Sequence, residues 1–303
     1  MSTLHVLLPP FTRVAEAAEF RRWLARGDRL PDATNARVMA LHAAFRFAGA
    51  TLPTAALRHH CHAGDATLGA WLCADPCYVH SEPAGARLMA CPLDDLTIAE
   101  AEALAKDLRP LCGDAGVPLA IDTPSAWCVH RSYGAPGATF VDPAEALGTD
   151  LLDCLPAGES GRKWRRLFNE IQIALHAHPI NAARIAEGKR PVNALWFWGA
   201  GALPGAVESA LTCVASDDDA VRGLAKLAGV RCVTMGMPDA MNDPGDALLD
   251  LGTLQDAVAL DAWLAPLQRT LRVRRFDALV LTFASGERFR LRRWHRLRFW
   301  RHA

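Results

Sequence analysis

Residues 178–201 read HPINAARIAEGKRPVNALWFWGAG, and this stretch decides the fold because a helical pattern ends in it and an apolar run begins. Before it, residues 161–178 carry apolar side chains at three- and four-residue spacing, which predicts a helix, and Pro179 ends that pattern. Residues 194–198 form an apolar run typical of a buried strand. Gly199 and Gly201 follow the run, where a backbone can approach a ligand closely.

Toward the C-terminus, more apolar runs alternate with helix-like segments. The runs cover residues 211–215, 231–235, 247–251 and 278–283, and the clearest helical segment between them is 220–228. At the N-terminus, a short run at residues 5–8 precedes a helical pattern over 14–26. This alternation favours a mostly parallel sheet with helices on both faces, which is an α/β fold.

The middle of the chain has a different pattern of apolar and turn residues. Five short apolar runs lie between residues 70 and 130, separated by turn residues, which indicates a smaller α+β unit. Within it, Thr97 and Glu100 have the spacing of a capping box at the start of a helix that is expected to reach Leu108. We therefore expect an α/β core of residues 1–65 and 190–303, with an inserted α+β domain of residues 66–189 that ends in a long helix.

Composition limits the classes of function. The chain has 303 residues, 51% of them hydrophobic, and equal numbers (33) of basic and acidic side chains, so its net charge predicts no nucleic-acid partner. Its nine cysteines are scattered, unlike a disulfide framework or a paired zinc motif, so we expect reduced thiols. Without a secretory leader or an apolar run of about 18 residues, the sequence predicts a cytoplasmic protein with no membrane span.

The pattern HPxNxxRxxxGKxPxNxLxxWGxG in residues 178–201 resembles a segment of the archaeal-type, 2,3-bisphosphoglycerate-independent phosphoglycerate mutases, and residues 221–229 resemble the helix that follows in that family. The resemblance is dense over about 50 residues. It implies an alkaline-phosphatase-like fold, a doubly wound and mostly parallel sheet with a smaller inserted α+β domain. It also implies that residues 178–201 leave the inserted domain and enter a strand of the core.

Five residues of this stretch are the candidate ligand-binding residues: Asn181, Arg184, Asn193, Gly199 and Gly201. A guanidinium such as that of Arg184 can grip a phosphate or carboxylate with two hydrogen bonds. The predicted ligand is therefore a small phosphorylated or carboxylated metabolite. The alternative is structural: the polar side chains tie an interdomain connection together by hydrogen bonds, and the glycines serve a tight turn.

The catalytic groups implied by the resemblance are missing from their expected places. Members of the family use a nucleophilic Ser and two divalent metals held by Asp and His, because two cations neutralise charge on the attacking and leaving oxygens. The first strand here reads HVLLPP at residues 5–10, with no carboxylate, and residues 276–286 read FDALVLTFASG, without the family's Gly-His pair. No nucleophile motif is visible between residues 34 and 70. We therefore assign no catalytic residue, no metal ligand and no cofactor.

A shorter bacterial group, the RpfE-type regulatory or phosphoglycerate-mutase-like proteins, resembles the chain more closely. The similar segments are WLCADP at residues 71–76 and RKWRRLFNEIQ at 162–172. The resulting interpretation is a degenerate mutase relative, a pseudoenzyme that binds a metabolite and acts in regulation. The alternative is an active mutase or phosphatase whose metal ligands are displaced, which would need Mn²⁺ or Mg²⁺.

Two clusters elsewhere have metal-binding residue types. Residues 59–62 read HHCH with Asp65 nearby, a donor set that suits zinc, but adjacent His59 and His60 diverge on a helix or a strand, so an exposed loop is expected. Residues 217–219 read DDD after an apolar run and could hold a cation through oxygen ligands. Asp219 is equally well explained as the N-cap of the next helix, which is the interpretation we favour.

The C-terminal strip, residues 288–301, reads RFRLRRWHRLRFWR and alternates cationic with apolar side chains. It predicts a last strand with Phe289 and Leu291 inward, paired through a turn at Ser285 and Gly286 to residues 278–283. Basic side chains interleaved with aromatic ones also suit an anionic polymer, such as RNA or single-stranded DNA, or an anionic membrane surface. This binding module is a further alternative function.

Overall fold

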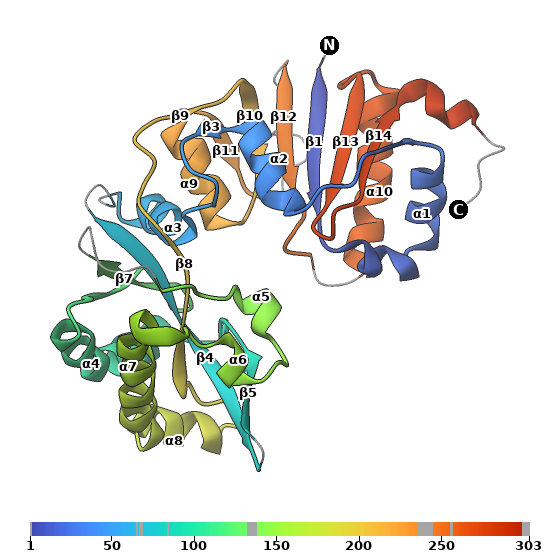
Figure 1. Cartoon of the computed structure of the whole chain (residues 1–303). Coiled ribbons are helices and arrows are strands. Elements are labelled where there is room, and N and C mark those ends of the chain that lie inside the picture. The colour runs from blue at the N-terminus through green and yellow to red at the C-terminus, as the bar shows by residue number, and fades with distance from the viewer. Residues whose placement is uncertain are drawn as a thin grey trace. The chain divides into compact units, whose positions relative to one another are not determined.

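The chain divides into two compact units, which are described separately (Figure 1). Unit 1 comprises Met1–Thr51 and Pro204–Ala303, and unit 2 comprises Leu52–Leu203. The structure is a computed structural model and describes residues 2–64, 66, 69–83, 85–131, 138–235, 245–254 and 257–298.

Unit 1 is built on a seven-stranded sheet. In spatial order the strands are β11 (Arg231–Val233), β10 (Leu211–Ala215), β12 (Asp246–Asp250), β1 (Thr3–Leu8), β13 (Ala278–Phe283), β14 (Arg288–Arg292) and β2 (Asp28–Leu30). The pairings from β11 to β13 are parallel, and β14 and β2 add an antiparallel edge. A separate two-stranded ribbon joins β3 (Arg46–Phe47) to β9 (Val207–Glu208).

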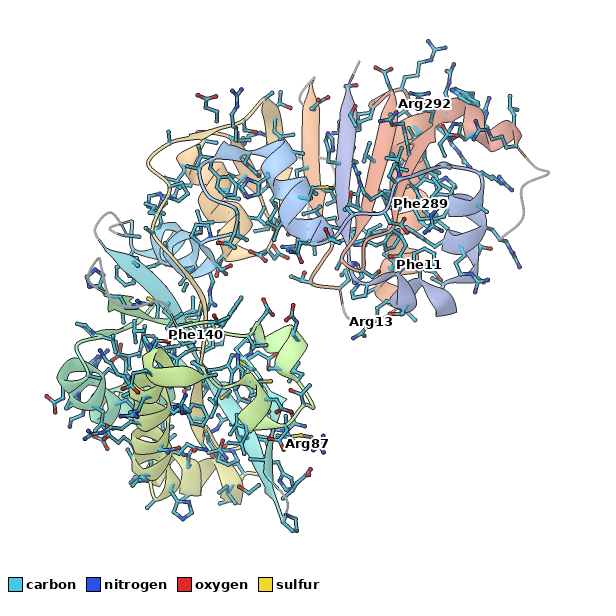
Figure 2. The ribbon with its side chains drawn as sticks, viewed as in Figure 1. Phe11, Arg13, Arg87, Phe140, Phe289 and Arg292 are labelled. Carbon is cyan, nitrogen blue, oxygen red and sulfur yellow. The ribbon has the colours of Figure 1, made fainter. Side chains whose placement is uncertain are left out.

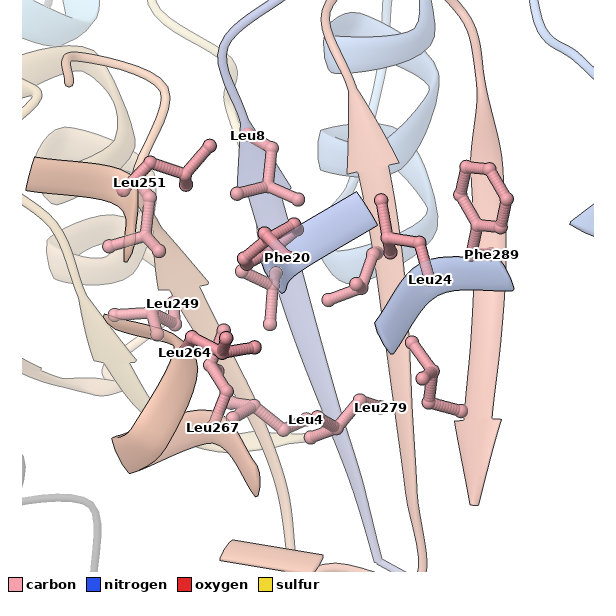
Figure 3. Close-up of a cluster of buried hydrophobic side chains, with 14 of the residues drawn as sticks. Leu4, Leu8, Phe20, Leu24, Leu249, Leu251, Leu264, Leu267, Leu279 and Phe289 are labelled. Carbon is pink, nitrogen blue, oxygen red and sulfur yellow. The ribbon is translucent and has the colours of Figure 1, made fainter. Parts of the chain in front are cut away.

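One face of this sheet carries the apolar core of unit 1 (Figure 3). Leu4 on β1 and Leu279 on β13 share the core with Phe20 of α1 (Ala18–Ala25) and Leu264 of α10 (Ala257–Arg272). Side chains alternate along a strand, so the residues between them, His5 among them, point to the other face. The remaining helical segments of unit 1 are η1 (Phe11–Glu16), α2 (Ala36–Ala44), α9 (Asp219–Leu227) and η3 (Arg293–Leu297).

Unit 2 is an antiparallel sheet with helices against it. Its strands are β4 (Ala70–Glu82), β5 (Gly85–Ala90), β6 (Leu119–Ile121), β7 (Trp127–Arg131) and β8 (Ala194–Gly201), and the long β4 pairs with β5, β7 and β8. Its helices are α3 (Thr54–His62), α4 (Ile98–Asp114), α5 (Pro143–Ala146), α6 (Leu151–Cys154), α7 (Gly158–His176) and α8 (Pro179–Ala186). The largest core of unit 2 joins α4 and α7 to β4, β7 and β8.

The α/β class with a parallel-rich sheet is confirmed, whereas the division of the chain differs from the expected one. The sequence predicted an inserted domain of residues 66–189 and a core strand at 194–198. The structure instead places α3 and β8 in unit 2, and the divisions fall after Thr51 and after Leu203. The physical reason is strand pairing: β8 hydrogen-bonds antiparallel to β4 from Trp71 to Cys77 and does not join the parallel sheet.

Several local predictions can be compared with the structure. The capping box is confirmed, since Thr97 Oγ1 accepts from Glu100 N and Thr97 N donates to Glu100 Oε2, and α4 continues past Leu108 to Asp114. The β13–β14 hairpin is confirmed, with Phe289 and Leu291 buried.

Two local predictions are wrong. Residues 59–62 lie in α3 instead of an exposed loop, because the apolar face of this helix, including Leu57, is buried; Asp65 lies outside the described residues. The N-cap of α9 is Asp218, not Asp219, since the Asp218 carboxylate accepts from the backbone N–H groups of Ala220 and Val221. Among the described residues, no helix is long and apolar enough to cross a membrane.

Candidate functional site

The buried amide of Asn181 joins the end of α7 to the start of β8. Its Nδ2 donates to the carbonyl oxygens of Leu175 at 2.8 Å and Val192 at 2.7 Å, and its Oδ1 accepts from Val192 N at 2.9 Å. Asn193, just before β8, likewise bonds to the backbone of β4. Its Oδ1 accepts from Val79 N at 2.8 Å, and its Nδ2 donates to Val79 O at 2.7 Å. Both side-chain amides therefore act as hydrogen-bond partners of backbone N–H and C=O groups inside unit 2.

Arg184 is 1% exposed and is held from three sides. Its guanidinium pairs with Asp95 at 2.6 Å and with Glu100 at 3.0 Å, and its Nε donates to Arg190 O at 2.9 Å. A buried guanidinium needs such partners, because an unpaired charge in the interior is strongly destabilising. This geometry links α8 to the start of α4 and gives Arg184 a structural role.

Gly199 and Gly201 allow α3 to approach β8. A Cβ on Gly201 would lie 2.4 Å from Pro53 Cβ, and one on Gly199 would lie 2.9 Å from Thr54 Cβ. Gly199 also has a φ of +63°, a left-handed conformation that favours glycine. All five residues predicted from the sequence thus belong to unit 2, but β8 separates them: Asn193 lies beside Val79 at its start and Gly201 beside Trp71 at its end. Their contacts agree with the structural interpretation.

The carboxyl ends of the parallel strands in unit 1 are the usual place for a ligand in an open α/β sheet. Asp250 ends β12 there with a fully buried carboxylate, and Arg37 of α2 binds it through two hydrogen bonds of 2.8 Å. Arg37 also pairs with Asp218 at 2.8 Å, and Ser216 Oγ donates to Asp250 at 3.0 Å. These residues form the Arg37–Asp250 cluster.

The charges of this cluster stabilise each other. Burial by itself raises the pKa of Asp250, but the hydrogen bonds and charge of Arg37 outweigh it, so the pKa of Asp250 is lowered. Burial likewise opposes the charged form of Arg37, yet Asp250 and Asp218 hold the pKa of Arg37 above its usual value. Gly252 makes room for this pair, because a Cβ there would lie 2.5 Å from Arg37 Nη1.

A second site of unit 1, which we call the arginine pocket, lies near the amino ends of β1 and β13. Its lining includes His5, which points away from the apolar core, and also Leu271 and Phe276, which belong to that core. It is a hollow of about 780 Å³, and Arg292 at the end of β14 forms part of its wall (Figure 2). In the register, His5 lies beside Val280 and Val280 beside Arg290, so strands far apart in sequence line one surface. The other basic side chains are Arg274 after α10 and Arg293 of η3, next to Trp294.

The arginine pocket has an excess of positive charge. Asp246 and Asp277 also line it, but their carboxylates accept hydrogen bonds from the backbone N–H groups of Thr3 at 2.7 Å and Ser2 at 2.9 Å. Within the described part of the chain, no carboxylate forms an ion pair with any of the four pocket arginines; these are Arg274, Arg290, Arg292 and Arg293. The pocket therefore offers several guanidinium donors to an anion.

Two further features belong to this pocket. Arg274 has a φ of +58°, and a non-glycine residue in this left-handed conformation costs about 1 kcal/mol. Burial lowers the pKa of His5 below the ordinary 6.5, the charge of Arg288 acts in the same direction, and Asp246 opposes them. At pH 7 the neutral form of His5 is therefore favoured in the absence of a ligand.

Among the described residues of unit 1, no group of three His, Cys, Asp or Glu side chains converges as metal ligands would. The sequence reasoning missed both the Arg37–Asp250 cluster and the arginine pocket as sites. Two features of the sequence could have indicated these sites. One is Asp250, a carboxylate at the end of an apolar run, and the other is the alternation of arginines with apolar residues in 288–293.

Comparison with known proteins places the similarity among phosphoglycerate mutases. No family model matches the chain. A Geobacter sulfurreducens protein described as "Probable 2,3-bisphosphoglycerate-independent phosphoglycerate mutase" is 37% identical over 109 residues, which are 32% of this chain and 26% of that protein. The 2,3-bisphosphoglycerate-independent phosphoglycerate mutase of Methanosarcina barkeri is 39% identical over 62 residues, 20% of this chain and 16% of that enzyme.

Two solved structures are also similar. The cofactor-independent phosphoglycerate mutase from Thermoplasma acidophilum has a TM-score of 0.45 and 12% identity, with 96% of this chain and 90% of that chain covered. A protein from Pyrococcus horikoshii has a TM-score of 0.47 and 12% identity, with 95% and 86% covered. The chain thus has partial homologues among the phosphoglycerate mutases, and the matched sequence spans about a quarter or less of their length.

Proposed function

We propose that the chain is a non-catalytic, phosphoglycerate-mutase-like regulatory protein of the RpfE type, cytoplasmic and of alkaline-phosphatase-like ancestry, which binds a small phosphorylated or carboxylated metabolite. The observation that carries the proposal is the arginine pocket, where four guanidinium groups line one hollow without a paired carboxylate among the described residues. The partial similarity to mutases of phosphoglycerate supports an acidic three-carbon ligand.

The chemistry of the pocket fits such a ligand. Guanidinium groups bind phosphate and carboxylate through two parallel charge-assisted hydrogen bonds. The volume of about 780 Å³ lies within the usual range for small-molecule sites. The arginines of the hollow come from β14, from η3 and from the segment after α10, so they can surround a compact anion, which favours a metabolite over an extended polymer.

The non-catalytic part of the proposal rests on the Arg37–Asp250 cluster. The carboxylates at the carboxyl ends of β10 and β12 already have a cationic partner, because Arg37 pairs with both Asp218 and Asp250. A divalent metal at this edge would meet a positive charge that is held in place by three hydrogen bonds. The alternative, an active mutase or phosphatase that uses Mn²⁺ or Mg²⁺, requires ligands from other residues.

Calorimetric titration of the whole chain with 3-phosphoglycerate tests the ligand. We expect binding that Arg290→Ala weakens roughly 10- to 100-fold, which is the effect of losing a hydrogen bond between charged groups. Arg46→Ala is the matched control, since this arginine lies in unit 1, is 86% exposed and is outside the pocket. The absence of heat with the wild-type protein, or equal affinities for wild type and Arg290→Ala, would overturn the proposal.

Two more measurements separate the alternatives. Turnover of 3-phosphoglycerate or of a generic phosphate ester, assayed with and without Mn²⁺ and Mg²⁺, should be undetectable; metal-dependent turnover would establish the active enzyme instead. An oligo-dT titration at low salt tests the anionic polymer. Binding to the oligonucleotide that is lost in Arg290→Ala, together with no response to 3-phosphoglycerate, would favour the binding module.

A further inference from the structure

Three potential metal ligands converge inside unit 2, whereas the Arg37–Asp250 cluster and the arginine pocket belong to unit 1. His59 comes from α3, Asp122 follows β6 and Cys128 lies on β7. A tight turn brings the last two together, because Asp122 N donates to Ala126 O at 3.0 Å between the paired strands. All three side chains are buried: His59 is 5% and Cys128 2% exposed, and the Asp122 side chain is 4% exposed.

The ligand atoms point at one place. His59 Nδ1 lies 2.6 Å from Asp122 Oδ1, and Cys128 Sγ lies 3.5 Å from both His59 Nδ1 and Asp122 Oδ2. This is not the geometry of a nucleophilic triad, in which the imidazole contacts the nucleophile through one ring nitrogen and the carboxylate through the other. Here the thiol and the carboxylate share the same nitrogen.

We propose that His59, Asp122 and Cys128 bind a zinc ion or another soft divalent cation. A tetrahedral zinc ion, with bonds of about 2.0 Å to N and O and about 2.3 Å to S, holds these ligand atoms about 3.3 to 3.6 Å apart. The two distances that involve sulfur already have this value. The distance between His59 Nδ1 and Asp122 Oδ1 is shorter, 2.6 Å, and must lengthen as their hydrogen bond is replaced by bonds to the metal.

The surroundings hold the imidazole ring in position. The indole of Trp71 stacks on His59 with ring centroids 3.8 Å apart, so the ring plane is fixed before a metal arrives. Arg58, a cation whose charge acts on the Cys128 thiol, is paired with Asp75 through hydrogen bonds of 2.8 and 2.9 Å. Repulsion of a metal ion by Arg58 is therefore reduced.

The proton balance of binding follows from the ligand chemistry. Burial raises the pKa of the Cys128 thiol, and the charge of Asp122 raises it further, so without metal the thiol is protonated. The bond from sulfur to the metal forms as the S–H bond breaks, and this proton leaves to solvent. In neutral His59 the ring proton moves from Nδ1 to Nε2, which frees the Nδ1 lone pair for the metal. One proton is thus released for each ion bound.

Cobalt replacement gives a direct test that does not depend on any activity. The whole chain is treated with a chelator and titrated with Co²⁺ and then Zn²⁺. We expect one equivalent of Co²⁺ to produce the thiolate charge-transfer absorption and the visible bands of a tetrahedral site while one proton is released, and Zn²⁺ to remove these bands without further proton release. Absence of thiolate–cobalt absorption in the wild-type protein would overturn the proposal, whatever the variants do.

Variants assign the ligands. Cys128→Ser and Asp122→Asn, both close in size to the native residues, should weaken Zn²⁺ binding by about 100-fold or more, and Cys128→Ser should abolish the charge-transfer band. Cys112→Ala, a buried cysteine of α4 outside the cluster, is the matched control and should retain the band. A band that survives Cys128→Ser but is lost in Cys61→Ala would place the metal on the histidine-rich end of α3 and refute the assignment. Because the cluster and the arginine pocket lie in different units, either proposal can fail without the other.

Discussion

Arg37 and the buried carboxylate of Asp250 form a bidentate ion pair at the carboxyl end of β12, with two hydrogen bonds of 2.8 Å. Removing one member of such a pair leaves an uncompensated charge in the interior, which costs about 3 to 5 kcal/mol. We expect Arg37→Met to lower the free energy of unfolding of unit 1 by this amount in urea titrations. Arg29→Ala is the control: Arg29 and Asp32 form an exposed pair, and its loss should cost about 1 kcal/mol or less.

The double variant Arg37→Met with Asp250→Leu sharpens this prediction. Replacing both charges by apolar groups leaves no fully buried carboxylate unpaired, because Asp218, which also loses Arg37, has a side chain that is 29% exposed. Most of the lost stability should therefore return. If the double variant is as unstable as Arg37→Met alone, the cost does not come from the unpaired charge of Asp250. In that case the packing of the Arg37 side chain would be the main contribution.

Replacement of Arg274 by glycine should change the stability of the fold and the affinity for the ligand in opposite directions. Glycine adopts the left-handed conformation at this position without steric cost, so Arg274→Gly should raise the free energy of unfolding by up to about 1 kcal/mol. The same change removes one of the four guanidinium groups of the arginine pocket and should weaken 3-phosphoglycerate binding roughly 10-fold or more. Thermal unfolding and calorimetry on the same preparation measure both effects. A variant that is more stable and binds equally well would exclude Arg274 from the site.

How much the sequence could predict depended on the range of the interactions. Local patterns were enough for the capping box of Thr97 and Glu100 and for the β13–β14 hairpin, because both are set by neighbours in the chain. The pairing of β8 with β4 joins residues more than 100 positions apart, and an apolar run reads alike in a parallel and an antiparallel sheet. The sequence therefore indicated a strand at residues 194–198 but assigned it to the other sheet.

The same limit explains the candidate sites. Arg184 has the chemistry of an anion ligand, and only the fold shows that Asp95 and Glu100 already occupy its guanidinium. Conversely, Asp122 and Cys128 have no motif that relates them to His59, since their convergence depends on the packing of α3 against β4 and on the turn after β6. The basic alternation of residues 288–293 was visible, but the hollow beside it was not.

His5 should make the stability of unit 1 depend on pH. Its pKa in the folded state is below 6.5, so between that lowered value and 6.5 the unfolded state binds more protons. The contribution of neutral His5 to the free energy of unfolding is therefore fully present above about pH 6.5 and is lost as the pH is lowered through this window. Urea unfolding from pH 5 to 8 should show this slope, and His5→Gln, which cannot take up the proton, should reduce it. An unchanged slope in His5→Gln would assign the effect to other groups.

The pH dependence of ligand binding should have the opposite sign. An anion in the arginine pocket favours the protonated form of His5, so binding raises its pKa and takes up a proton. Affinity for 3-phosphoglycerate should therefore increase as the pH is lowered below about 6.5, although the folded state itself becomes less stable there. Calorimetry in buffers of different ionisation enthalpy measures the proton uptake, which should be absent in His5→Gln. Equal uptake in both proteins would show that His5 does not sense the ligand.

Gly201 tests whether the glycines after the 194–198 run serve packing. A Cβ at Gly201 would lie 2.4 Å from Pro53 Cβ and 2.8 Å from Pro53 Cα, so α3 or β8 must shift to accept it. We expect Gly201→Ala to lower the free energy of unfolding of unit 2 by about 1 to 3 kcal/mol, the usual range for overpacking. Gly205→Ala is the matched control, because a Cβ there meets no atom within 4 Å and should change stability by less than about 1 kcal/mol.

Affinity for 3-phosphoglycerate should be unchanged in both variants, since the arginine pocket lies wholly in unit 1. A loss of 3-phosphoglycerate binding in Gly201→Ala, without a loss of stability, would instead indicate that the ligand binds at residues 178–201, the stretch HPINAARIAEGKRPVNALWFWGAG.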